Sequence, residues 1–299
     1  MNRGVLCALI AYLFWGLLPL FWKALAGVPS LEIIGHRIIW SAVLTGIILT
    51  VRRDFRWIRT SMRNTKTRTT ILTTSVLIGL NWLTYIWAVN AGFILEASLG
   101  YFIHPLINVL LGVVFLRERL RMWQWIAVVF AAAGVTVMTF GYGVFPWISL
   151  FLALSFAFYG LLRKTVHLDA LPGLFCETTL LSIPAVMYLA ILGIQGRGAF
   201  GHGSPDMTVL LFLAGVVTAL PLILFTIAAR RIPLSSIGIL FYIAPTLQFV
   251  LGVTVYGEPF PVERMLGFIL IWIALILFTV EGAKYSHHRK QRRTSAAGN

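Results

Sequence analysis

Residues 101–118, YFIHPLINVLLGVVFLRE, decide the fold, because a related stretch follows 140 residues later at residues 241–258, FYIAPTLQFVLGVTVYGE. The two stretches share isoleucine, proline, leucine, glycine, valine and glutamate at the same spacing: Ile103, Pro105, Leu111, Gly112, Val113 and Glu118 in the first, and Ile243, Pro245, Leu251, Gly252, Val253 and Glu258 in the second. Proline and glycine mark special backbone positions, so their common spacing argues against chance likeness between apolar segments. A shorter pair, FWGLL at 14–18 and FYGLL at 158–162, repeats near an offset of 144. The chain is therefore expected to contain an internal repeat.

The composition around these stretches is that of an integral membrane protein. Of 299 residues, 59% are hydrophobic and 11% are charged, and the mean hydropathy is +0.89. The apolar residues form long runs, which excludes a soluble enzyme or secreted domain and disfavours an outer-membrane barrel. The net charge of +14 would suggest nucleic acid in a soluble protein, but the basic residues cluster between apolar runs, so no nucleic-acid partner is expected. Cys7 and Cys176 lie in separate runs without ligand spacing, so no disulfide, metal site or cofactor is expected.

Ten apolar runs have the length that crosses a bilayer core of about 30 Å. The first run contains Trp15 and Pro19 and lacks a small-residue cleavage site, so we expect a retained helix rather than a signal peptide. Because the repeat unit holds five runs, the second copy enters the membrane in the opposite orientation. We therefore predict an all-α polytopic protein with ten transmembrane helices in two inverted five-helix repeats, 1–140 and 141–283, followed by a basic tail at 284–299. The predicted spans are 4–25, 30–51, 69–90, 96–116, 122–140, 144–162, 173–194, 207–229, 235–256 and 262–281.

The basic residues also predict the orientation. Of the 24 Lys and Arg residues, 20 fall on the side of the N-terminus, three on the other side, and Arg37 inside a span. Cytoplasmic loops carry the excess of Lys and Arg, so both termini are predicted to be cytoplasmic, in a cell inner (plasma) membrane. Glu118 and Glu258 lie at span junctions, where ion pairs with neighbouring arginines are expected to hold the loops.

Several segments together resemble the EamA branch of the drug/metabolite transporter superfamily, and they extend over nearly the whole chain. The resemblance implies ten helices in two inverted halves, cytoplasmic termini, and export of amino acids or other small metabolites. His104 stands where asparagine is expected in the similar segment. The segments are AYLFWGLLPLFWK, EIIGHRIIW, NWLTYIWAVN, EASLGYFIHPLINVLLGVVFLRERL, FAFYGLLRK and YIAPTLQFVLGVTVYGE.

The fourth predicted span carries a polar face. Tyr101, His104 and Asn108 are spaced three and four residues apart, so they share one side of a helix that Pro105 is expected to interrupt. The repeat places Gln248 opposite Asn108, and Pro245 opposite Pro105, so each half supplies an amide and a helix interruption near mid-span. This arrangement suits a solute site at the membrane midplane. The alternative is that Asn108 and Gln248 only bind neighbouring helices.

Aromatic residues provide the remaining candidates for the solute site. Trp15 and Tyr159 are equivalent in the short repeat, and Trp82 and Tyr85 share a face beside the intramembrane Asn81. Aromatic walls with a few polar groups suit an apolar or aromatic solute with a polar head. Ordinary helix packing is the alternative for each aromatic residue.

The second span holds the strongest charge cluster, formed by Glu32, His36 and Arg37. Arg37 lies roughly 10 Å from the outer end of the span, where an unpaired cation is costly. One interpretation is a structural pair of Arg37 with Glu32 or with carbonyl groups. The other is an outer gate, or a cation that recognises a carboxylate. His104 and His36 are the candidates for coupling to protons.

These features favour a secondary transporter that binds a small molecule and works by alternating access. No nucleotide-binding loop, filter-like sequence or known catalytic motif is visible, which disfavours a pump, a channel and an enzyme built on Glu32 and His36. A membrane sensor or assembly protein that binds a solute without transporting it remains the alternative. Expected partners are a small-molecule substrate, the lipid bilayer and protons, while the sequence makes no prediction of oligomeric state.

Overall fold

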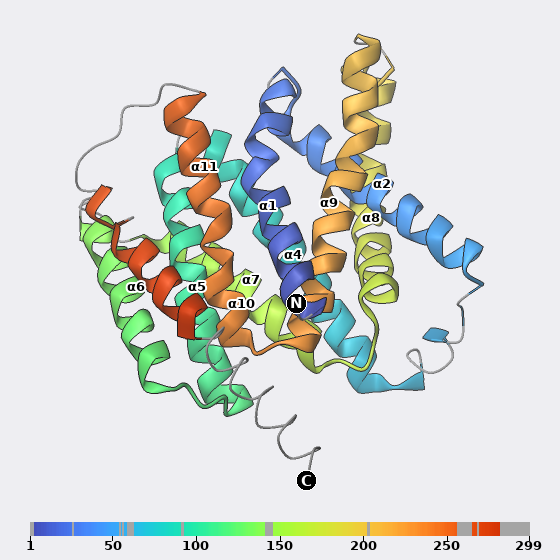
Figure 1. Cartoon of the computed structure of the whole chain (residues 1–299). Coiled ribbons are helices and arrows are strands. Elements are labelled where there is room, and N and C mark those ends of the chain that lie inside the picture. Colours follow the sequence, from blue (N-terminus) through green and yellow to red (C-terminus); the bar gives the residue numbers. More distant parts are fainter. Residues whose placement is uncertain are drawn as a thin grey trace.

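The computed structural model describes residues 3–25, 27–53, 55, 57–58, 63–90, 93–140, 146–201, 204–255, 265–267 and 269–281, and every regular element within these ranges is a helix. The predicted tail at 284–299 and Glu258 lie outside the described residues. Figure 1 shows the helices side by side as a bundle. The labelled helices are α1 (Arg3–Ala24), α2 (Ser30–Val51), α4 (Thr65–Asn90), α5 (Ile94–Leu116), α6 (Met122–Phe140), α7 (Trp147–Thr165), α8 (Ala170–Ile194), α9 (Pro205–Arg231), α10 (Leu234–Phe241) and α11 (Ile243–Thr254).

Seven described helices are long and apolar enough to cross a membrane, and three shorter apolar segments match the remaining predicted spans. The shorter segments are Met122–Val137, Leu234–Gln248 and Met265–Glu281. The all-helical class and the ten apolar segments are therefore confirmed, with boundaries that differ by a few residues. The protein is a multi-pass membrane protein.

The ninth predicted span is broken. α10 ends at Phe241 and α11 begins at Ile243, with Tyr242 between them. The break comes three residues before Pro245, the predicted interruption. Proline has no N–H group and its ring crowds the carbonyl of the residue four positions earlier, which here is Phe241, so the helix gives way at that turn.

The prediction that Pro105 interrupts the fourth span was wrong, because α5 runs unbroken from Ile94 to Leu116. α5 packs against α7 on one side and α10 on another, and such neighbours support a helix that has lost one backbone hydrogen bond. A hydrogen bond also joins α5 to the break between α10 and α11, since the Tyr242 hydroxyl donates to the Phe102 carbonyl across 3.2 Å.

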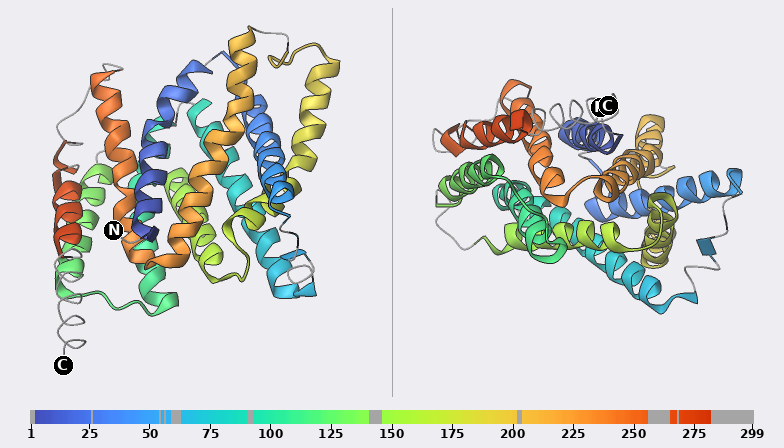
Figure 2. Two further views of the ribbon diagram at one scale, coloured as in Figure 1. Left: turned by 45° about the vertical axis from the view of Figure 1, so that its right-hand side comes forward. Right: turned by 60° about the horizontal axis from the view of Figure 1, so that its bottom comes forward.

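Helices from the first and second parts of the chain are intermixed (Figure 2). α1 packs against α9, α10 and α11, and α2 packs against α8 and α9, while α4 packs against α7 and α8. Glycine permits two of the closest approaches. A side chain at Gly215 of α9 would collide with Trp40 of α2, and a Cβ atom at Gly238 of α10 would lie 2.5 Å from the Pro105 carbonyl oxygen of α5.

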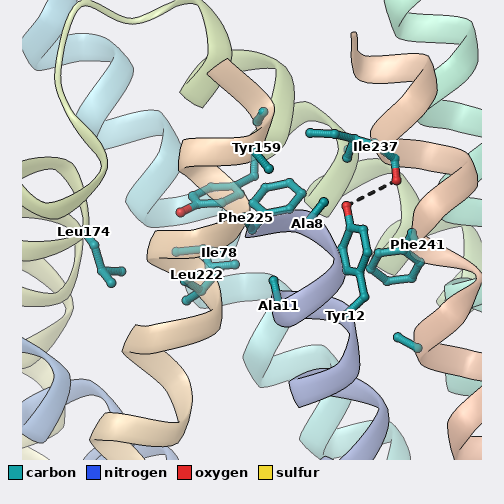
Figure 3. Packing of buried hydrophobic residues seen from close by; sticks show 14 of the residues in the cluster. Ala8, Ala11, Tyr12, Ile78, Tyr159, Leu174, Leu222, Phe225, Ile237 and Phe241 are labelled. Atoms are coloured by element: carbon teal, nitrogen blue, oxygen red, sulfur yellow. Dashed lines mark hydrogen bonds between the residues drawn. The ribbon is translucent and has the colours of Figure 1, made fainter. Parts of the chain in front are cut away.

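The bundle is closely packed toward the end where α1 begins. Tyr12 is fully buried and its hydroxyl donates to the Ile237 carbonyl across 3.2 Å, as Figure 3 shows. The Tyr12 ring meets Phe241 edge-on at 5.3 Å between centroids. Phe225 and Tyr159 are fully buried beside them. These aromatic rings form a floor under the cavity described next.

Candidate solute site

A cavity of about 370 Å³ lies between α1, α2, α4, α5, α7, α9, α10 and α11. This volume is at the lower end of the roughly 300–1,000 Å³ that is usual for small-molecule sites. Seven of the nine side chains predicted to bind solute line it, namely Trp15, Asn81, Trp82, Tyr85, Tyr101, His104 and Gln248. Helices that are distant in sequence therefore bring these candidates to one place.

The cavity occupies the half of the bundle away from the start of α1. Trp15 and Trp22 come from the second half of α1, whereas Arg37 lies near the start of α2. His104 and Phe156 come from the first halves of α5 and α7. Tyr12, Tyr159 and Phe225, which are fully buried, pack on the side of the cavity toward the start of α1.

Arg37 is the charged side chain in the cavity wall. Its Nε donates to the Thr218 hydroxyl across 3.0 Å, and its guanidinium carbon lies 4.9 Å from the Trp22 ring centroid and 4.7 Å from that of Trp82. Two cation–π contacts in a desolvated setting contribute about 1–2 kcal/mol each. Arg37 is therefore fixed in position by Thr218 and two tryptophan rings. Among the described residues it binds neither Glu32 nor a carbonyl group, the partners that the structural interpretation had expected.

Glu32 and His36 lie outside the cavity and separate from Arg37. The Glu32 Oε1 atom accepts the backbone N–H groups of Ala199 and Phe200 at 2.6 and 3.2 Å. The His36 Nδ1 atom accepts from the Trp40 indole across 3.2 Å, and its ring stacks on Phe200 at 4.7 Å. The predicted charge cluster is thus divided, because Glu32 and His36 hold the segment that joins α8 to α9.

We expect Glu32→Ala to destabilise the protein by about 1–3 kcal/mol, because two half-buried backbone N–H groups lose their carboxylate acceptor. The measurement is the midpoint of thermal unfolding in detergent. Asp206→Asn is the control, since Asp206 is exposed at the start of α9. A shift no larger than that of the control would contradict the assignment.

Tyr85 and Tyr101 form a polar pair in the cavity wall. Their side chains are hydrogen-bonded to each other, and their ring centroids lie 5.7 Å apart. Two amides are engaged at the edge of the cavity: Asn81 Nδ2 donates to the Leu152 carbonyl, and Gln248 Nε2 donates to the Trp15 carbonyl, each across 3.0 Å. The wall thus combines rings with fixed polar groups.

Asn108 does not line the cavity, although it shares a helix face with His104. Its Nδ2 atom lies 3.1 Å from Nε2 of His104, and Asn108 is fully buried. Gly238 brings α10 so close to α5 that it fills the space in front of Asn108. Asn108 therefore lies behind His104, which lines the cavity and is itself 2% exposed.

Tyr159 is the second predicted residue that the cavity excludes. Its hydroxyl donates to Glu177 Oε2 across 3.2 Å, and Arg163 Nε lies 3.7 Å from Glu177 Oε1. Arg163 and Glu177 are both almost completely buried. Tyr159 itself belongs to the aromatic floor, and Arg163 and Glu177 lie late in α7 and early in α8.

Comparison with known proteins agrees with this architecture. The family model described as "EamA-like transporter family" matches residues 2–140. The uncharacterized transporter YojE of Bacillus subtilis is 46% identical over 97% of this chain and 97% of its own length. Protein RarD of Escherichia coli is 43% identical over 98% of each chain. This chain belongs to the EamA-like transporter family.

A solved crystal structure has the same fold as this EamA family member. The two share 16% identity with a TM-score of 0.71, over 93% of this chain and 98% of the other. At that identity the likeness concerns the fold alone.

The cavity also contains residues that the sequence interpretation missed. Phe241 and Ala244 line it, and they stand 140 residues after Tyr101 and His104, so the repeat itself carried the signal. Trp22 and Thr218 also line the cavity, and both contact Arg37. No pattern in the sequence marks Thr218, because its role depends on how α9 crosses α2.

Proposed function

We propose that the protein is a secondary transporter that exports small organic solutes, such as amino acids, small metabolites or drug-like molecules, across the inner (plasma) membrane by alternating access. The observation that carries the proposal is the aromatic cavity between helices of both halves of the chain, with one fixed cation in its wall. Membership of the EamA-like transporter family supports it.

The helix contacts support two inverted halves, 1–140 and 141–283. If the halves are exchanged, the contact of α1 with α9 becomes that of α7 with α4, and the contact of α2 with α9 becomes that of α8 with α4. The contact of α1 with α10 and α11 becomes that of α7 with α5, and the α2–α8 and α5–α10 contacts map onto themselves. Every one of these contacts is present, as a pseudo-two-fold arrangement requires.

The positions of the basic turns support a cytoplasmic location for the end where α1 begins. The turns after α5, α7 and α9 lie at this end of the bundle in Figures 1 and 2. Arg117, Arg119 and Arg121 lie in the turn after α5, while Arg163 and Lys164 lie in the last turn of α7 and Arg230 and Arg231 in the last turn of α9. In this orientation the cavity lies in the outer half, and the cytoplasmic half is closed.

Glu118 and Lys164 form a cytoplasmic latch at the junction of α9 and α10. The Glu118 carboxylate accepts the backbone N–H groups of Leu234 and Ser235 at 2.7 and 3.0 Å, and also the Ser235 hydroxyl. Lys164 Nζ donates to the Ala229 and Ile232 carbonyls. Glu118 therefore caps the N-terminus of α10, whereas the sequence had predicted an ion pair that holds a loop. These bonds must break before the cytoplasmic side can open.

The test is exchange of labelled solutes in proteoliposomes, using aromatic and small amino acids and chloramphenicol, with and without an imposed pH gradient. Trp15→Ala and Gln248→Ala should lower exchange roughly tenfold or more, because each removes cavity contacts. Trp147→Ala is the matched control, since Trp147 is 52% exposed and outside the cavity. Normal exchange in both cavity variants would contradict the site, and solute binding without any exchange would identify a sensor.

A further inference from the structure

Building on the proposed function, we propose that the transported solute is a small monocarboxylate, with its carboxylate bound by Arg37 and an aromatic or branched apolar body held by the cavity wall. The charge, the geometry and the volume of the cavity each favour such a solute.

The charge of the wall selects an anion. Arg37 is 9% exposed and, among the lining residues that the structure describes, it is the one with a formal charge. The ion pairs found in the described ranges do not include it, and Glu32 instead binds the backbone at Ala199 and Phe200. A buried cation without a counter-charge is costly, and a single negative charge on the solute would offset that cost.

The geometry selects a planar acceptor. Arg37 uses Nε for Thr218 and the faces of its guanidinium for Trp22 and Trp82. In the part of the chain that the structure describes, the side chain makes no further hydrogen bond, so its terminal N–H groups are available. These groups match the two oxygens of a carboxylate in a bidentate pair.

The volume and lining select the rest of the solute. A space of about 370 Å³ is walled by the rings of Trp15, Trp82, Tyr101, Phe156 and Phe241. Such a wall stabilises a body of one or two rings, or a branched apolar chain, through area burial and stacking. One guanidinium balances one charge, so a monocarboxylate fits better than a dicarboxylate or a phosphate dianion.

The test compares carboxylates with their neutral amides by calorimetric titration of the purified full chain. The pairs are phenylacetate and phenylacetamide, 3-phenylpropionate and 3-phenylpropanamide, and N-acetylphenylalanine and its amide. The carboxylate should bind roughly 10–100-fold more tightly, as expected for charge-assisted hydrogen bonds. Arg37→Gln should abolish the preference, because it removes the charge that binds the carboxylate, and Arg37→Lys should keep part of it. Arg197→Gln, an exposed arginine after α8, should change nothing.

Equal binding of both members in every pair, no binding at all, or a preference that survives in Arg37→Gln would overturn the anion site. Exchange of the same six compounds in proteoliposomes separates this inference from the proposed function. Amides exchanged as fast as carboxylates would overturn the inference and leave the transporter. Arg37-dependent binding with no exchange of any compound would keep the anion site and overturn transport.

Discussion

Glu177→Ala is expected to destabilise the folded protein by about 3–5 kcal/mol, because it leaves the buried Arg163 guanidinium without its counter-charge. Arg163 is 1% exposed, and its Nη2 donates to the Asp169 and Ala170 carbonyls. Gly173 leaves room for this side chain, since a Cβ atom there would collide with the guanidinium. Tyr159 would also lose the acceptor of its hydroxyl.

The measurement is the free energy of unfolding in mixed micelles with increasing denaturing detergent. The double variant Arg163→Met with Glu177→Met is the informative control, because an apolar pair of similar volume removes both charges together. The double variant should regain most of the free energy of unfolding that Glu177→Ala loses. If the double variant is as unstable as Glu177→Ala, the cost comes from packing and not from an unpaired charge.

Glu118→Ala is expected to raise the equilibrium constant for opening toward the cytoplasm by roughly 5–150-fold. This factor corresponds to about 1–3 kcal/mol. The carboxylate binds two N–H groups and a hydroxyl of α10, at the end of the bundle where α1 begins. Gly112 permits the close approach, since a Cβ atom there would lie 2.7 Å from Oε2 of Glu118. Losing these contacts therefore destabilises one state more than the other.

Alkylation of Cys7 in a Cys176→Ala background measures this shift, because Cys7 packs against the buried cluster near the start of α1. Its rate should rise in Glu118→Ala. Glu281→Gln is the matched control, since the ion pair of Glu281 with Arg121 lies outside the α9–α10 junction. Equal rates in the wild type and in Glu118→Ala would show that the latch does not control access.

The sequence predicted the helices well because each span must satisfy its backbone internally and remain apolar, which leaves long runs that are easy to count. It also predicted most of the cavity, since few polar groups occur in these runs and helical spacing groups them on faces. Trp82 and Tyr85 beside Asn81, and Tyr101 beside His104, were found in this way.

The misses have two physical causes. The first is depth, as Trp15 and Tyr159 are equivalent in the repeat, yet only the late part of α1 and the early part of α7 reach the cavity. The second is helix crossing. Asn108 lies on the predicted face, but α10 approaches it at Gly238. The spacing of residues along one helix predicts neither the depth of a side chain in the bundle nor the place where another helix crosses. It also could not predict that Arg37 and Glu32 have separate partners.

Alternating access at this cavity is tested most directly by the sidedness of a single cysteine in its wall. Val217 lines the cavity from α9, so Val217→Cys places a thiol in the wall and leaves Arg37 unchanged. The substitutions Cys7→Ala and Cys176→Ala remove the native thiols. In sealed, oriented vesicles, a membrane-impermeant maleimide should label this cysteine from the outer side, and from the cytoplasmic side as well once Glu118→Ala is added. Labelling that occurs only from the outer side in both proteins would contradict alternating access.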